Sequence, residues 1–116
     1  MNKYAQTALK AHTYIEKGIS AEEAWEKASC EYFKKGAASQ VKGCPKCAFL
    51  GFFSKNEKIT ESKNAQYAKK ALKVLQTDPK RRYTAKELWV AIGNENKSYN
   101  QQMDVVLILW EKGIIK

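Results

Sequence analysis

A chain of 116 residues, 44% hydrophobic and 28% charged, is long enough to bury a core as one domain over 1–116 and excludes an extensively disordered protein. Its longest apolar runs, 48–53 and 105–110, are far shorter than the roughly 20 residues of a membrane span, and its N-terminal segment lacks an apolar signal-peptide core. Three cysteines do not make the disulfide framework of a secreted domain. We therefore expect a cytoplasmic protein with no membrane partner.

The net charge of +9 is spread over both halves of the chain. Such a charge attracts phosphate polyanions and acidic surfaces, although a lysine-rich solvated surface gives the same composition. Its densest cluster is Lys80, Arg81 and Arg82, preceded by further lysines in the same half. The charge therefore favours a polyanionic or acidic partner without identifying it.

Hydrophobic periodicity and capping residues predict four helices before this cluster. They span residues 3–17, 21–33, 45–53 and 61–76. The second helix begins with a capping box from Ser20 to Glu23, and the fourth ends before Pro79 because the residue preceding a proline avoids helical angles. Residues 36–43 contain two glycines without clear periodicity, which predicts a loop.

Two further helices are predicted at 85–92 and 99–112, joined by a short polar turn. Capping boxes precede both of them, Thr84 to Glu87 and Ser98 to Gln101, and each is followed by a glycine suited to a left-handed terminal residue. Only 82–83 and 113–116 look extended, enough for a minimal β-ribbon at most. The sequence thus predicts a mainly α protein in which an N-terminal helical layer, 1–56, packs on a C-terminal half, 57–116.

This C-terminal half, with its TAKELWVAIG-NENKS-YNQQMDVVLILW pattern, resembles the helix-turn-helix core of the winged-helix family. The resemblance implies a third helix whose first residues read base edges in duplex DNA while nearby cations hold phosphates. The phosphate-binding positions would be Lys80, Arg81, Arg82 and Lys97, and the base-reading positions Ser98, Tyr99, Asn100, Gln101 and Gln102. The segments GCPKCAFLGFF and QQMDVVLILW also resemble those of small uncharacterised bacterial proteins, which implies no activity.

An alternative function follows from residues 105–110, which are apolar around the whole helix. Such a helix is typically buried, either by the N-terminal helices or by a second subunit. The alternative is therefore a protein-interaction or dimerisation module that uses this helix, because winged-helix folds also serve protein recognition.

The Gly43-Cys44-Pro45-Lys46-Cys47 segment carries the second candidate site. Proline is favoured at the first helical position, which predicts Cys44 at the N-cap and Cys47 on the third helical residue. Both thiols would then face the positive end of a helix dipole, as in a dithiol redox site. A zinc site completed by Cys30 and His12 and a pair of packing cysteines are the other interpretations.

No arrangement of carboxylates, histidine and nucleophiles predicts catalysis, since the only histidine is His12 and no phosphate-binding glycine loop is present. We expect a non-enzymatic protein, with zinc as the one cofactor that the cysteines suggest.

Overall fold

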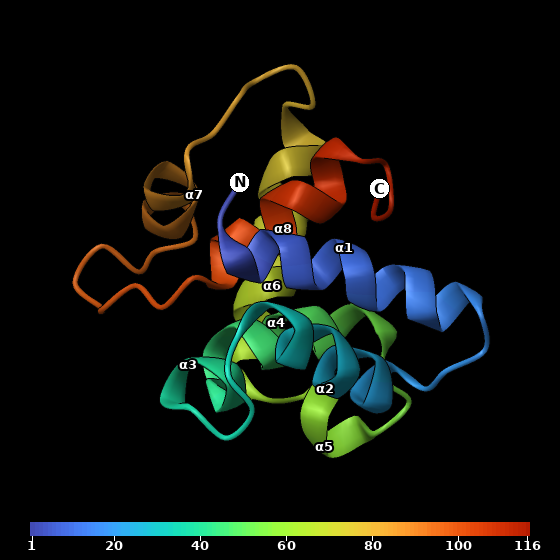
Figure 1. The fold of residues 1–116 in the computed structure, drawn as a ribbon. Coiled ribbons are helices and arrows are strands. Elements are labelled where there is room, and N and C mark those ends of the chain that lie inside the picture. Colours follow the sequence, from blue (N-terminus) through green and yellow to red (C-terminus); the bar gives the residue numbers. More distant parts are fainter.

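The computed structural model describes all residues from 1 to 116 and contains eight helices and no strand (Figure 1). In chain order the helices are α1 (Lys3–Glu16), α2 (Ala21–Tyr32), α3 (Ala38–Val41), α4 (Gly43–Phe53), α5 (Glu57–Thr60), α6 (Lys63–Thr77), α7 (Ala85–Ala91) and α8 (Gln102–Glu111). The prediction of a mainly α protein is confirmed. The winged-helix detail is not, because the two predicted extended segments form no ribbon and ten residues separate α7 from α8.

Helices α1 and α2 form a hairpin that covers one side of the molecule. Asn2 and Ser20 begin the two helices, each accepting a backbone N–H with its side chain. The facing surfaces carry small buried residues, which let the two helices approach closely. These residues are Ala5, Ala8 and Ala11 on α1 and Ala21, Ala24 and Ala28 on α2.

Two short helices lie where the sequence predicts none: α3 within the 36–43 segment, which is predicted as a loop, and α5 between α4 and α6. Each is a single turn of four residues, too short to show a hydrophobic period in the sequence. Helix α4 also begins earlier than predicted, at Gly43, with Lys42 at the N-cap. Cys44 is therefore the second helical residue and Cys47 the fifth, so the predicted capping position of Cys44 is wrong.

Local signals set both ends of α6 and the start of α7. Ser62 caps α6 at its start, and the helix ends at Thr77 with Asp78 as the C-cap before Pro79. The predicted capping box of α7 is confirmed, because Thr84 Oγ1 accepts the Glu87 N–H at 3.1 Å and the Glu87 carboxylate accepts the Thr84 N–H at 2.9 Å. Between the two helices, the chain arches over the top of the molecule in Figure 1.

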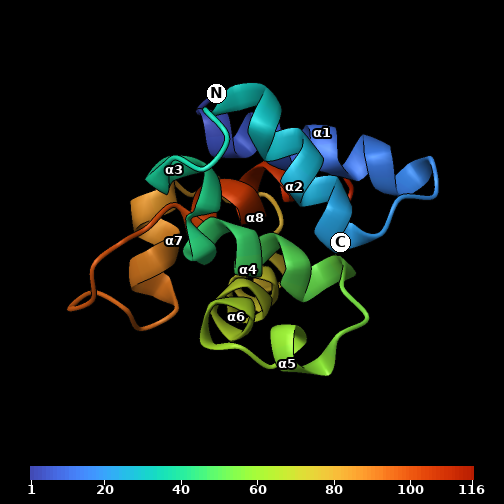
Figure 2. The same ribbon diagram turned by 60° about the horizontal axis from the view of Figure 1, so that its bottom comes forward.

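Helix α8 occupies the centre of the fold, as Figure 2 shows, and contacts α1, α4, α6 and α7. One hydrophobic core of 22 buried residues joins both halves of the chain, with Phe49 of α4 and Leu109 of α8 among its fully buried members. Four residues of the apolar run 105–110 are therefore buried within the chain, and the other two, Leu107 and Trp110, are partly buried. Not one of the helices combines the length and the apolar composition that a membrane span needs.

Candidate nucleic-acid interface

The first residues of α8, predicted to read base edges, make contacts inside the protein instead. Helix α8 begins at Gln102 rather than 99, and Gln101 precedes it at φ 65° with no side-chain capping bond. The Gln102 side chain is only 3% exposed; its amide donates to Asn64 at 2.9 Å and accepts the Asn100 N–H at 3.0 Å. The predicted capping box at Ser98 is thus wrong, and the Gln102 side chain is bonded within the protein.

Tyr99 supplies the N-terminal contact that the sequence assigned to Ser98. Its hydroxyl accepts the Asp104 N–H at 2.9 Å and donates to the Asp104 carboxylate. Burial, followed by the nearby carboxylate, raises the pKa of Tyr99 well above its ordinary value. Its ring lies 5.5 Å from that of Trp89, measured between centroids. The residue therefore holds the start of α8 and stays neutral.

We expect Tyr99→Phe to lower the free energy of unfolding by about 1–3 kcal/mol, because the Asp104 carboxylate and N–H lose their shared partner in a partly buried site. Urea denaturation followed by circular dichroism measures this loss. Tyr32→Phe is the matched control, since the Tyr32 hydroxyl makes no hydrogen bond, and it should change stability by less than about 0.5 kcal/mol. Equal effects of the two variants would contradict the role given to Tyr99.

The remaining predicted positions in this segment lie on the surface or bind other parts of the chain. Lys97 is exposed and donates to the Tyr67 hydroxyl at 3.0 Å, a bond that lowers the pKa of Tyr67. Gln101 accepts a hydrogen bond from Lys42 at 2.5 Å, which ties the start of α4 to that of α8. Ser98 is exposed and Asn100 half-buried. Ser98 and Asn100 are thus the two predicted base-reading residues whose side chains make no hydrogen bond outside residues 98–100.

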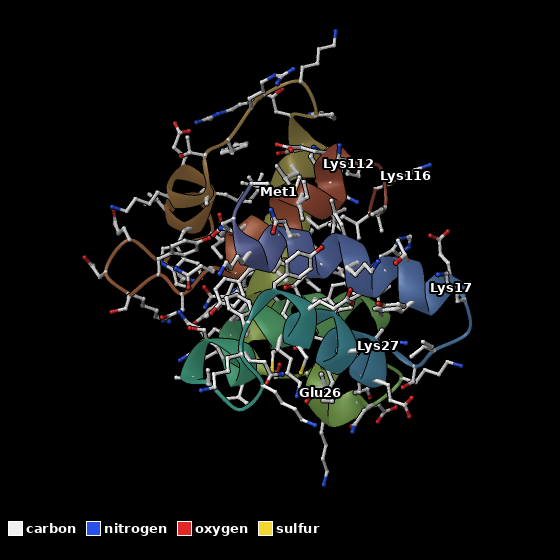
Figure 3. All side chains as sticks on the ribbon, in the orientation of Figure 1. Met1, Lys17, Glu26, Lys27, Lys112 and Lys116 are labelled. Carbon is white, nitrogen blue, oxygen red and sulfur yellow. The ribbon has the colours of Figure 1, made fainter.

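The basic cluster of the sequence forms an exposed loop between α6 and α7, which we call the basic loop (Pro79–Tyr83). Lys80, Arg81 and Arg82 are all exposed, and Figure 3 shows nitrogen-ended side chains projecting from this part of the chain. The Arg81 guanidinium lies over the Tyr83 ring, 4.3 Å from its centroid. Among all 21 lysines and arginines, Lys10 alone comes within 4.0 Å of a carboxylate. The charges of the basic loop are therefore not neutralised within the protein.

A groove of about 570 Å³ lies beneath the basic loop, between the ends of α6 and α8. It is lined by Leu75, Pro79, Lys80, Arg81, Arg82, Tyr83, Leu107, Trp110 and Glu111. Lys112 and Lys116 lie at the same end of the molecule (Figure 3), where the Gln76 side chain donates to the Lys116 carbonyl at 2.8 Å. The cations are apparent in the sequence but the groove is not, because its walls come from three separate segments of the chain.

The cysteines and His12 do not assemble into the zinc site that was one interpretation of the sequence. His12 contacts Phe53 at the end of α4, with ring centroids 5.7 Å apart, and pairs with Glu16 at 3.5 Å. Cys44 lies near the beginning of α4, and a helix rises about 13 Å over the nine residues from 44 to 53. No three His, Cys, Asp or Glu side chains come together in a group that could hold a metal ion. The residues present therefore do not fit zinc.

The three cysteines are free thiols, each partly exposed. Cys30 lies on α2 with its sulfur 3.9 Å from a Glu26 carboxylate oxygen. No base stands beside Cys44 or Cys47 in a hydrogen bond that would activate either thiol. The fold therefore adds no activating group to the two cysteines that the redox interpretation would use.

The fold and surface define a helical protein with a central buried helix and a cationic groove at one end. The chain belongs to a family of unknown function (DUF6979), whose model matches residues 1–116. No curated protein and no solved structure matches it.

Proposed function

We propose that this protein binds nucleic acid, without catalysing a reaction, through the basic loop. The observation that carries the proposal is the exposure of three consecutive cations, Lys80, Arg81 and Arg82, with no carboxylate within ion-pairing distance. A cation that is not paired within the protein is free to replace the counterions of a phosphate backbone, and the release of those counterions drives binding.

The chemistry of the basic loop suits phosphate. Arginine presents a planar fork of donors that matches phosphate oxygens, while lysine acts as a mobile point charge. Lys112 and Lys116 extend the positive potential at the same end of the molecule. Contacts of this kind position a nucleic acid without reading its sequence.

The proposed interface keeps Lys80, Arg81 and Arg82 of the predicted phosphate-binding residues. It leaves out Lys97, Tyr99 and Gln102, whose polar groups are bonded within the protein. Helix α8 serves as the core helix of the fold in this proposal. Binding therefore depends on charge rather than on a recognition helix.

The test is a titration of a fluorescently labelled random-sequence DNA duplex with the full chain. If three phosphates are contacted, the affinity should fall roughly 40-fold between about 50 and 200 mM salt. Reversal of the three charges, Lys80→Glu, Arg81→Glu and Arg82→Glu together, should remove most of the affinity and flatten this salt dependence.

The matched control reverses three exposed lysines outside this region, Lys34→Glu, Lys35→Glu and Lys55→Glu, and so lowers the net charge by the same amount. It should keep most of the affinity at the higher salt concentration. Equal losses in the two triple variants would mean that the overall charge alone attracts DNA. An absence of binding by the unmodified protein to both the duplex and its separated strands would overturn the proposal.

The alternative function is a dimer formed through residues 105–110. Sedimentation velocity on the same preparation tests it by measuring the oligomeric state. Because α8 is already covered by α1, α4, α6 and α7, we expect a monomer at micromolar concentration. A stable dimer without DNA affinity would favour the protein-interaction function instead.

A further inference from the structure

The groove beneath the basic loop combines two kinds of surface. Its rim carries Lys80, Arg81 and Arg82, opposed by one carboxylate, Glu111. Its apolar lining comes from Leu75 at the end of α6 and from Leu107 and Trp110 on α8. A volume of about 570 Å³ lies within the range of sites that hold small organic ligands. The groove is thus suited to a flat apolar group attached to an anion.

Trp110 differs from the other two tryptophans of the chain. Trp25 and Trp89 are 1% and 4% exposed, whereas Trp110 is only half-buried and lines the groove. Helix α8, most of which faces the core, therefore carries near its end an indole, that of Trp110, which contacts solvent. An aromatic ring beside exposed arginines is the combination on which bases of an unpaired strand stack.

Tyr83 adds a second planar surface to the same site. The Arg81 guanidinium covers one face of its ring at 4.3 Å from the centroid. Arg81 is exposed, so its outer face remains available to stack on a base or to contact the adjoining phosphate. The stacking groups and the phosphate-binding groups therefore lie within one groove.

We propose that this groove binds an unpaired nucleobase, stacked on Trp110, while Lys80, Arg81 and Arg82 hold the flanking phosphates. This inference rests on the proposed function and narrows its ligand to single-stranded nucleic acid. A duplex would have to unpair and unstack a base to fill the groove, which costs a few kcal/mol. A flexible strand presents its bases at no such cost, and the protein should select it over the duplex.

The experiment compares three labelled ligands of equal length with the full chain: a mixed-sequence DNA strand, its duplex, and a strand of abasic sites with the same backbone. We expect the strand to bind about 10-fold more tightly than the duplex or the abasic strand, as one or two stacked bases would provide. Binding of the strand, but not of the abasic strand, should also quench tryptophan fluorescence.

Variants of Trp110 identify the stacking group. Trp110→Phe keeps an aromatic ring and should keep most of the preference for the strand, whereas Trp110→Leu should bring strand and abasic strand to equal affinity and abolish the quenching. Their melting temperatures show whether each variant is folded. The abasic ligand tests stacking with the unmodified protein, so the result does not depend on either variant.

Three outcomes separate the two proposals. A base-dependent, Trp110-dependent preference supports both of them. Salt-dependent binding of all three ligands with equal affinity would overturn the stacking inference and leave the basic loop as a backbone-binding surface. No binding of any ligand would overturn the proposed function itself.

Discussion

Gly51→Val is expected to lower the free energy of unfolding by about 3 kcal/mol, because α4 and α6 touch at this glycine. A β-carbon at position 51 would lie 2.8 Å from the Ala65 Cβ and 3.0 Å from the Ala65 Cα. The second atom belongs to the backbone, so no change of side-chain rotamer relieves the overlap. The two helices would have to separate, and the core residues between them would lose contacts. Thermal and urea denaturation measure the loss.

Gly43 provides the matched control, since it is a second glycine of the same helix. A β-carbon there meets no atom within 4 Å. Gly43→Val should therefore change the stability by less than about 0.5 kcal/mol. If both valine variants are equally unstable, the close contact between α4 and α6 at Gly51 is not the cause of the loss.

Leu109→Ala is expected to destabilise the protein by about 2–5 kcal/mol, the cost of a cavity in a core that cannot fully collapse. Leu109 is fully buried on α8, where α1, α4 and α6 enclose the helix. A helix that served DNA recognition on the surface would tolerate the same change on its outer face. Denaturation by urea measures the difference directly.

Glu111→Ala in the last turn of the same helix is the control. Glu111 is exposed, and its replacement should shift the stability by less than about 0.5 kcal/mol. A Leu109→Ala variant as stable as the control would contradict the central position of α8.

The helices that the sequence predicted correctly are those with local signals. Thr84 and Glu87 lie within one turn, and the φ values of Gly93 and Gly113, 92° and 69°, agree with the left-handed positions expected after the last two helices. Such contacts depend only on neighbouring residues, so the sequence contains all the information that they need.

The start of α8 was mispredicted because distant residues determine it. Ser98 has the composition of a cap, yet the Gln101 side chain bonds Lys42 and the Gln102 side chain bonds Asn64, both far away in the sequence. The start of α4 illustrates a different cause. Pro45 is accommodated at the third helical position as well as the first, because the first four N–H groups of a helix have no partner within it.

The candidate site also has one part that the sequence predicts and one part that depends on distant residues. Three consecutive cations are visible in any reading of the sequence, whereas the groove requires the end of α6, the basic loop and the end of α8 to meet. The sequence predicts burial for the whole apolar run 105–110, which includes Trp110. In the structure Trp110 is only half-buried at the end of α8, unlike Trp25 and Trp89.

The central position of α8 also determines the order in which the chain can fold during synthesis. The α1–α2 hairpin consists of neighbouring segments and can form as soon as it leaves the ribosome. The space that α8 fills between α1, α4 and α6 stays open until residues 102–111 have emerged. The nascent chain therefore exposes apolar surface that the finished protein buries, and such surface favours aggregation until α8 is in place.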